Sequence, residues 1–431
     1  MTSQERPKVV VLGAGFAGVQ AIRQLSRAHV DVTWVDQHPY STFQPLLYQV
    51  ATGGLNAGDI TYPLRHLSAR HKVRFRRATV LGIDRTSRQV LVDAGAPIPY
   101  DYLIVGIGTV ADHFGVPGAA DHSMSMYTRT DALAVRDRIF GGLERLAGQS
   151  GPGADEFHIV VVGGGATGVE MAGAIAELKQ SMVSKAFPEL DESRVRVTLV
   201  EMAGALLAPF DERLQDYTYR QLIKRGVDVR LTTAISSVHE DRVDLKDGST
   251  WPADLVVWAA GMTGGAEDGW GLPTGRGGRI VVDDDLRVPG LGTVFAVGDA
   301  AINPADPMAQ LAQPAMQMGK HAARQIARLE RGKAAQPFRY RDKGTMATIG
   351  NRAAVVQLSI GPRITGTIAW ATWVLLHIWF LLGGRNRIGT LVNLAYQYLL
   401  WPRRTGAIVG DISSLPPSAH ETRSTARQEV T

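Results

Sequence analysis

Two glycine-rich turns carry the clearest chemical signal in this chain. The first is GAGFAG, with Gly13, Gly15 and Gly18, between the β-branched run Lys8–Leu12 and a helical pattern at Val19–Ala28. In such a turn the first glycine allows a tight bend, the second lets the backbone approach a pyrophosphate, and the third lets helix pack on strand. The phosphates then sit on the free N–H groups at the helix start. The spacing therefore predicts a dinucleotide site.

An acidic residue completes the first turn. Asp36 follows a second apolar strand at Trp34–Val35 and lies 23 residues after Gly13. A carboxylate at this point is placed to accept hydrogen bonds from a ribose 2′-OH. Strand, glycine turn, helix, strand and acid together indicate a Rossmann-like unit rather than an isolated glycine-rich turn.

The same layout occurs again after a glycine-rich linker. Strand Ile159–Val162 leads into GGGATG, a helical pattern covers Val169–Lys179, and the next strand ends at Glu201. The glycines of this second turn are Gly163, Gly165 and Gly168. Glu201 lies 38 residues after Gly163, and we expect the excess, 180–193, to form an inserted loop or a helix extension. An acid rather than an arginine at the strand end favours NADH over NADPH, the alternative for Glu201 being a solvated carboxylate.

Three further motifs place polar groups at the ends of predicted elements. A strand at Tyr102–Val105 ends in glycines and Thr109, a spacing that suits a chain passing close to a ligand. In TVFAVGDA a strand delivers Asp299, either as a turn residue or as a ligand contact. Gln313 and Gln317 are four residues apart in a helix predicted over 312–331, so both amides project from one face.

Composition sets limits on the chemistry. The chain of 431 residues has no cysteine, which excludes disulfides, thiolate metal sites and a catalytic dithiol. The histidines are scattered without metal-ligand spacing, so we predict no metal. The net charge is +5, but we see no Lys/Arg block with interleaved aromatics and predict no nucleic-acid partner. No apolar signal core is evident at the N-terminus, and the cytoplasmic side is the expected location.

The C-terminal part is unusually apolar. Gly366–Gly383 is short for a span of about 20 residues, and Thr390–Trp401 is interrupted by polar Asn393 and Gln397. Tryptophans and arginines gather around both segments, as at a membrane interface. We therefore predict helices lying in one leaflet, a buried helix pair or a dimer interface being the alternatives. Polar Ser413–Thr431 is predicted to be a disordered tail.

Taken together, these motifs resemble the type II NADH:quinone oxidoreductases, single-subunit respiratory NADH dehydrogenases that pump no protons. The segments that carry the resemblance are FQPLLYQVATGG (Phe43–Gly54), VVGGGATGVEMAG (Val161–Gly173), WAAG (Trp258–Gly261), VFAVGDA (Val294–Ala300), AQPAMQ (Ala312–Gln317), DKGTMATIG (Asp342–Gly350) and AWATWVLLHIWFLLGGRNR (Ala369–Arg387). The chain departs from the family at Ala166, where proline is common, and at Gly106-Ile107-Gly108, where Ala-Thr-Gly is usual. These departures concern fine cofactor contacts.

The resemblance implies an α/β fold with two Rossmann-like dinucleotide-binding domains, for FAD and NADH, and a C-terminal helical membrane-binding region. The implied ranges are 1–150 and 286–362 for the two parts of the FAD domain, 151–285 for the NADH domain, 363–410 for the membrane helices and 411–431 for the tail.

Residue roles also follow from the resemblance. FAD is expected at the first turn and Asp36, with Thr109 close to it, Asp299 at the ribitol, and Ala312 and Gln313 beside the ring. NADH is expected at the second turn and Glu201. Glu170 is implied near the nicotinamide and flavin, for orientation or proton supply, unless it only complements the helix dipole in the first turn. Gln317 and Lys343 are implied at the quinone. The alternative for Lys343 is a surface lysine in an ion pair.

The implied reaction passes hydride from NADH to FAD and then two electrons to a quinone, either ubiquinone or menaquinone. It is expected at the cytoplasmic face of the inner membrane, with peripheral, monotopic attachment. Whether a homodimer forms is left open. Two rival functions remain: an NADH-dependent reductase of a small electron-transfer protein such as rubredoxin or ferredoxin, and a nucleotide-binding redox sensor at the membrane.

Overall fold

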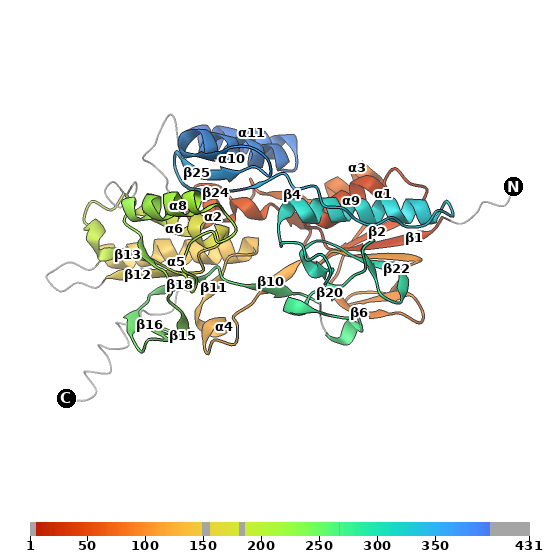
Figure 1. Cartoon of the computed structure of the whole chain (residues 1–431), viewed down its shortest axis with the longest axis horizontal. Helices are drawn as coiled ribbons and strands as arrows, with labels where there is room; N and C mark the ends of the chain where they lie inside the picture. Colours follow the sequence, from red (N-terminus) through yellow and green to blue (C-terminus); the bar gives the residue numbers. More distant parts are fainter. Residues whose placement is uncertain (1–5, 149–155, 181–185, 267, 397–431) are drawn as a thin grey trace. The chain divides into compact units, whose positions relative to one another are not determined.

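The computed structural model describes residues 6–148, 156–180, 186–266 and 268–396 (Figure 1). The chain forms two compact units, each assembled from separate stretches. Unit 1 comprises 1–42, 61–110 and 262–343, and unit 2 comprises 43–60, 111–261 and 344–431. The units are defined by contacts, whereas the predicted ranges 1–150, 151–285 and 286–362 refer to cofactor domains, so those ranges stay a prediction.

Unit 1 is built on a six-stranded sheet with the order β21-β22-β9-β1-β2-β5. β1 lies parallel to β2 and β9 at its centre, as the continuous β-branched run predicts for a strand buried on both faces. Helices α1 and α9 pack against each other in this unit. The strands are β1 (Lys8–Leu12), β2 (Asp31–Asp36), β5 (Arg74–Arg77), β9 (Tyr102–Val105), β21 (Arg287–Val288) and β22 (Leu291–Ala296), and the helices are α1 (Phe16–Leu25), α3 (Leu64–His71) and α9 (Ala312–Leu329).

Smaller elements complete unit 1. A three-stranded antiparallel sheet consists of β6 (Val80–Asp84), β7 (Gln89–Val92) and β8 (Ile98–Pro99). Two further pairs of short strands are β3 (Tyr40–Thr42) with β4 (Thr61–Pro63), and β20 (Ile280–Val281) with β23 (Ala301–Ile302). The other short strands are β19 (Met262–Gly264) and β10 (Thr109–Ala111), of which β10 begins in this unit. The short 3-10 helices are η4 (Asp268–Trp270), η5 (Arg276–Gly278) and η6 (Gly298–Ala300).

Unit 2 has a five-stranded parallel sheet with the order β11-β18-β12-β13-β14. Every residue of β12 is buried, and all but His158 are apolar, as expected for a strand covered on both faces. The strands are β11 (Met124–Ser125), β12 (Phe157–Val162), β13 (Val195–Val200), β14 (Asp228–Arg230) and β18 (Leu255–Trp258), with β15 (Ile235–Val238), β16 (Arg242–Leu245) and β17 (Thr250–Pro252) in an antiparallel sheet. The helical pieces are η1 (Gln44–Leu46), α2 (Leu47–Ala51), α4 (Ala119–His122), α5 (Arg129–Ala147), α6 (Ala166–Leu178), η3 (Glu192–Arg194) and α8 (Glu212–Lys224).

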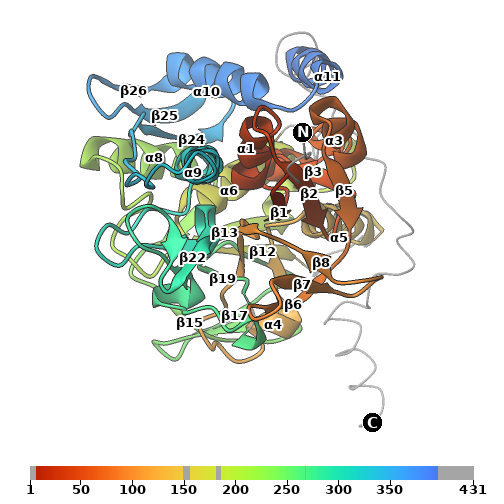
Figure 2. The same ribbon diagram turned by 90° about the vertical axis from the view of Figure 1, so that its right-hand side faces the viewer.

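The C-terminal part of unit 2 is an antiparallel sheet covered by a helix. β24 (Thr345–Gly350), β25 (Ala353–Gln357) and β26 (Arg363–Thr365) form the sheet, and α10 (Gly366–Phe380) lies along β25. Figure 2 shows α10 above β25 from the side. α11 (Gly384–Ala395) follows. Within the described ranges, none of the helices combines the length and apolar character needed to cross a membrane.

Several predicted helix limits are wrong. α1 ends at Leu25 rather than Ala28, and α9 at Leu329 rather than Arg331. α1 begins at Phe16 rather than Val19, and α6 at Ala166 rather than Val169, because the third glycine of each turn lies inside the helix. α11 begins at Gly384, six residues before the apolar segment Thr390–Trp401, because the polar Arg-Asn-Arg segment forms its first turn. Trp401, Gln397 and the predicted tail lie outside the described residues.

The expectation that the chain has no Lys/Arg block with an interleaved aromatic is wrong. RHKVRFRR, over 70–77, is such a block. In the structure Arg74, Arg76 and Arg77 of this block have partners within unit 1. Arg74 pairs with Asp31 at 2.5 Å, and the Arg77 side chain donates to a backbone carbonyl. Arg65 from α3 lies 5.5 Å from the centre of the Phe75 ring. The expectation of no nucleic-acid partner stays a prediction.

Candidate functional site

The first glycine turn has the geometry that a bound pyrophosphate requires. Gly13 has φ +92°, in the region that favours glycine. A Cβ on Gly13 would lie 2.3 Å from the Gly106 carbonyl oxygen, and one on Gly18 would lie 2.0 Å from that of Gly13. Gly15 differs, because nothing lies within 4 Å of its Cβ position. Two glycines are therefore required by packing, whereas Gly15 leaves open space at the N-terminus of α1, where an anion binds.

Asp36 holds this turn in shape. Its Oδ2 accepts a hydrogen bond from the Ala14 N–H at 2.7 Å, and its Oδ1 accepts one from the His38 N–H at 2.7 Å. Burial raises the pKa of Asp36, while these two N–H groups oppose that rise. The carboxylate thus fixes the loop that would carry the dinucleotide. Its predicted contact with the ribose stays a prediction.

The second turn repeats this geometry in unit 2. Gly163 has φ +109°, a Cβ on Gly168 would lie 1.8 Å from the Gly163 carbonyl oxygen, and the Cβ position of Gly165 is open to at least 4 Å. Glu201 accepts from the Gly164 N–H at 2.5 Å through Oε2 and from the Ala203 N–H at 2.6 Å through Oε1. The longer spacing to Glu201 therefore does not alter its position at the strand end.

Unit 1 brings Asp299 and the start of α9 to its glycine turn. Gly298, in η6, has φ +69°, and a Cβ there would lie 3.2 Å from the Ala17 Cβ and 3.3 Å from the Ala315 Cβ. α1, η6 and α9 therefore converge. Burial raises the pKa of Asp299 to about 6, and the positive charge of Arg279 opposes that rise.

Arg279 is a buried residue that sequence reasoning missed. Its Nε donates to the Asp299 carbonyl oxygen at 3.1 Å, and its two terminal nitrogens donate to the Met308 carbonyl oxygen at 3.1 and 3.2 Å. One guanidinium thereby connects η6 to the loop that leads into α9. Its segment, GRGGR, gives no periodic signal that would have marked it.

The predicted amide pair lies at the start of α9, as the i,i+4 spacing indicates. Ala312 and Gln313 open the helix and are half-buried. The Gln317 amide is already engaged: its Nε2 donates to the Arg341 carbonyl oxygen at 3.0 Å, and its Oε1 accepts from the Arg341 N–H at 3.1 Å. Lys343 follows two residues later and is exposed. Gln317 thus anchors the segment that carries Lys343, while the quinone contacts of both stay predictions.

Glu170 is half-buried and has partners on β24 and α10 of unit 2. Because α6 begins at Ala166, Glu170 is not in the first turn, and the dipole explanation weakens accordingly. Its Oε1 accepts from the Thr348 N–H of β24 at 3.3 Å, and its carboxyl group also has a hydrogen bond with the Trp373 side chain of α10. Burial raises its pKa to about 8. A carboxyl group that is mostly protonated at neutral pH is suited to supply a proton.

The predicted residue Thr109 is buried at the start of β10, directly after Gly108 with φ +75°. The positive φ of Gly108 is a backbone conformation that favours glycine. Nothing in the structure tests which group Thr109 contacts in a bound cofactor, so that role stays a prediction.

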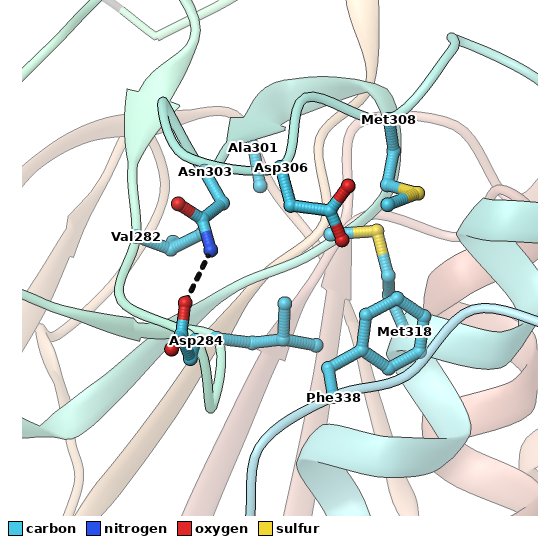
Figure 3. A pocket seen from close by; sticks show the side chains of 9 residues that line it. Val282, Asp284, Ala301, Asn303, Asp306, Met308, Met318 and Phe338 are labelled. Carbon is cyan, nitrogen blue, oxygen red and sulfur yellow. Dashed lines mark hydrogen bonds between the residues drawn. The ribbon is translucent and has the colours of Figure 1, made fainter.

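A separate pocket in unit 1 involves none of the predicted site residues. It is lined by Val282, Asp284, Leu286, Ala301, Asn303, Asp306, Met308, Met318 and Phe338. Asn303 Nδ2 donates to Asp284 Oδ1 at 2.8 Å across it (Figure 3). Among the described residues no cluster of three or more His, Asp or Glu side chains could hold a metal ion.

Comparison with known proteins places these sites in a family. A model of the family described as pyridine nucleotide-disulphide oxidoreductase matches residues 7–319. The chain is 37% identical over 414 residues to the type II NADH:quinone oxidoreductase NdhA of Mycobacterium tuberculosis, covering 91% of this chain and 87% of that protein. It is 32% identical over 375 residues to a type II NADH:quinone oxidoreductase of Staphylococcus haemolyticus, covering 84% and 92%.

A solved structure has the same fold. NDH2 from Plasmodium falciparum, in complex with NADH, superposes with a TM-score of 0.85 at 18% identity, covering 93% of this chain and 100% of that one. Paired glycine turns, a fold shared along nearly the whole chain and curated relatives above 30% identity agree with the resemblance seen in the sequence. The chain belongs to the type II NADH:quinone oxidoreductases, within the pyridine nucleotide-disulphide oxidoreductase family.

Proposed function

We propose that this chain oxidises NADH and passes two electrons through FAD to a respiratory quinone, without pumping protons. The observation that carries the proposal is the pair of glycine turns, one per unit, each open at its second glycine and each closed by an acidic residue. The absence of cysteine means that no protein dithiol takes part. When bound, FAD supplies a ring that accepts hydride and releases electrons.

The residues present fit the two cofactors. In unit 1, Gly15 leaves room for a pyrophosphate, and Ala312 and Gln313 lie at the start of α9. We assign Asp36 to a ribose and Asp299 to the ribitol, as the family resemblance implies. In unit 2, Gly165 leaves the corresponding room for NADH, and the negative charge of Glu201 disfavours the 2′-phosphate of NADPH. The family resemblance puts Glu170 near the nicotinamide.

The quinone side is assigned to Gln317 and Lys343. Gln317 fixes the backbone at Arg341, so it positions the lysine segment. Its NH2 group has a second hydrogen, which we assign to a carbonyl of the quinone head group. The exposed Lys343 ammonium group is suited to stabilise negative charge on a reduced quinone. A quinone analogue therefore has two candidate polar contacts, one on α9 and one just beyond the Arg341 backbone.

Two half-reactions test this function. The purified holoprotein is reduced by NADH without oxygen, and flavin reoxidation is then followed after adding ubiquinone or menaquinone analogues, or a rubredoxin or ferredoxin. We expect fast reoxidation by a quinone and slow reoxidation by the proteins. Fast reoxidation by a protein carrier alone would favour the reductase alternative, and stoichiometric reduction without turnover would favour the sensor.

We assign membrane attachment to α10 and α11. Both helices expose large apolar side chains, among them Ile368, Leu375, Trp379, Ile388, Leu391 and Val392. Arg387 lies 5.6 Å from the Trp379 ring centre, a cation beside an aromatic ring as at a lipid interface. We therefore infer monotopic attachment to the cytoplasmic face of the membrane, a dimer interface being the alternative.

Point substitutions test attachment better than truncation. Ala369, Trp373 and Ile378 of α10 are buried, so deleting the helix would also expose the core of unit 2. Replacing Leu375 (64% exposed) and Ile388 (66% exposed) together with glutamate should abolish sedimentation with anionic vesicles while flavin content stays unchanged. The matched control is Leu81→Glu, 56% exposed on β6 of unit 1, which should still sediment. Unchanged sedimentation of the double variant would contradict the inference.

A further inference from the structure

The surroundings of Glu170 come from three elements of unit 2. α6 carries Glu170, and β24 supplies the Thr348 N–H at 3.3 Å. The third element is α10, whose Trp373 side chain reaches the same carboxyl group with a hydrogen bond. Because an indole has a single polar hydrogen and no acceptor, Trp373 is the donor in that bond.

Trp373 is itself held from two sides. It is 2% exposed, and the His377 ring stacks on it with centroids 3.9 Å apart and an interplanar angle of 23°. The Tyr48 ring of α2 meets it edge-on at 5.9 Å. The indole therefore has little freedom to turn its N–H away from Glu170.

His377 braces this arrangement in its neutral form. Its Nδ1 lies 2.7 Å from the Trp373 carbonyl oxygen, which only accepts hydrogen bonds, so the ring proton is on Nδ1. Burial lowers the pKa of His377 to about 4, so the imidazole carries no charge near neutral pH. The Phe43 ring lies edge-on to it at 6.1 Å.

We propose that Trp373 is a positioning residue for Glu170, with His377 holding the indole in place, so that α10 fixes the orientation of the carboxyl group. This proposal rests on the proposed function insofar as Glu170 takes part in NADH oxidation. It goes beyond that function because it assigns roles to two side chains of the C-terminal helix.

The other titratable groups around α6 do not take over this role. Tyr48 on α2 contacts the Trp373 ring, and β24 has no titratable residue. Glu177, at the far end of α6, accepts from the Asn351 N–H and has Arg225 beside it at 3.9 Å. On the strands beside α6, His158 bonds to Thr198 and Arg196 to Glu156. On α8, Arg220 pairs with Asp216. The pKa of Glu170 is set by burial and by the N–H groups of Thr348 and Trp373.

The sign of the effect follows from the donor. An N–H group stabilises the ionised carboxylate, so it lowers the pKa against the rise caused by burial. Removing the indole N–H should therefore raise the pKa of Glu170 further. The loss of one hydrogen bond to a charged group corresponds to a shift of about one pH unit.

The test compares Trp373→Phe with Trp379→Phe in the full-length, flavin-loaded protein. Phenylalanine keeps a ring at 373 but has no N–H, and Trp379 is an exposed tryptophan (71%) of the same helix. Two quantities are measured against pH: the rate of flavin reduction by NADH, and the infrared carbonyl band of the protonated Glu170, identified by its loss in Glu170→Gln. We expect Trp373→Phe to shift both titrations up by about one pH unit and Trp379→Phe to shift neither.

The His377 variants give a second, independent reading. His377→Ala removes the stacked ring and should shift the infrared titration in the same direction as Trp373→Phe, whereas His377→Phe keeps a ring and should shift it less. These variants decide the question if Trp373→Phe does not fold. An infrared titration that is unchanged in Trp373→Phe, or in His377→Ala where Trp373→Phe does not fold, overturns the proposal.

Failure of the proposed function gives a different pattern. If Glu170→Gln leaves the pH dependence of flavin reduction intact, Glu170 has no part in NADH oxidation. The infrared shift in Trp373→Phe would still report whether the indole positions the carboxyl group.

Discussion

The two glycine turns are built alike as far as the helix that follows them, and they differ in what covers that helix. In unit 1, α1 is covered by α9: a Cβ on Gly319 would lie 2.1 Å from the Ala17 carbonyl oxygen. In unit 2, α6 is covered by β24: a Cβ on Gly173 would lie 2.0 Å from the Ile349 carbonyl oxygen. In both, one glycine lets another backbone approach to contact distance.

The difference in cover changes the chemistry two residues past the third glycine. Both side chains are half-buried, but unit 1 has Gln20 there, which does not titrate, whereas unit 2 has Glu170, which accepts from the Thr348 N–H of β24 and has the Trp373 side chain of α10 beside it. A strand edge offers backbone N–H groups to a buried carboxylate, which the side of a helix cannot do, because helical N–H groups are already bonded. The turn therefore determines where a dinucleotide binds, while the element that covers the helix determines whether the side chain two residues past the third glycine can titrate.

The largest expected effect separates the two turns. Gly18→Ala should prevent FAD retention, because its Cβ would lie 2.0 Å from a backbone oxygen inside the turn. Gly168→Ala, with 1.8 Å to the equivalent oxygen, should keep FAD and lower the efficiency of NADH oxidation by about 10- to 100-fold, in line with overpacking costs of roughly 1–3 kcal/mol. Flavin absorbance and steady-state kinetics measure both effects.

The control for this pair is Gly148→Ala, whose Cβ would meet its nearest neighbour at an ordinary 3.6 Å. It should keep both flavin and activity. Equal loss of flavin in Gly18→Ala and Gly168→Ala would show that the two turns do not serve separate cofactors.

A second prediction makes unit 2 resemble unit 1 at the differing position. Glu170→Gln introduces the residue type found at Gln20. The folded-state pKa of Glu170, about 8, lies above the ordinary value of 4.5, so the native state keeps a proton that the unfolded chain loses. Stability should therefore fall as pH rises from about 4.5 to about 8, by a few kcal/mol, and this fall should be absent in Glu170→Gln.

Melting temperatures at pH 5 and pH 8 test this prediction. We expect the melting temperature of the variant, relative to that of the parent protein, to rise by a few degrees from pH 5 to pH 8. Any cost from altered hydrogen bonds is present at both pH values and cancels in the comparison. A difference between variant and parent that does not change with pH would mean that Glu170 is already ionised in the folded protein.

The glycine turns could be read from the sequence because their requirements are local. Gly18 and Gly168 each meet the carbonyl oxygen of the glycine five residues earlier, and the positive φ values of Gly13 and Gly163 belong to the turn itself. The glycine pattern does not show where each helix begins. It predicts a start after the third glycine, whereas α1 begins at Phe16 and α6 at Ala166, so each helix contains that glycine.

The remaining site features depend on contacts between distant segments. Trp373 lies 203 residues from Glu170, and the Gln317 amide is bonded to a backbone 24 residues away. Neither pairing leaves a periodic pattern, because a single hydrogen bond constrains only one residue on each segment. The i,i+4 spacing identifies Gln317 as a candidate site residue on α9. The spacing cannot show that the Gln317 amide makes two hydrogen bonds with the Arg341 backbone.

The last difference between the turns concerns the residue after the first glycine. Ala14 stands beside the shorter acid, Asp36, and Gly164 beside the longer one, Glu201. A Cβ on Gly164 would lie 2.9 Å from the Glu201 Cγ and 2.7 Å from a Leu206 methyl group. The extra methylene of glutamate thus fills the space that the alanine methyl group occupies in unit 1, and the two positions are matched by size.

This matching predicts a coupled pair, the smallest effect of the three. Gly164→Ala alone should lower kcat/KM for NADH by about tenfold, or roughly 1.4 kcal/mol, because the methyl group displaces Glu201. Adding Glu201→Asp, which reproduces the Asp36–Ala14 pairing, should restore part of that loss, giving a coupling of about 1 kcal/mol in a double-mutant cycle. Ala14→Gly is the matched control: it creates no clash and should cost at most about 1 kcal/mol of stability, with the NADH kinetics unchanged. Strictly additive losses in the cycle would mean that the space beside Gly164 is set by Leu206 and not by the length of the acid.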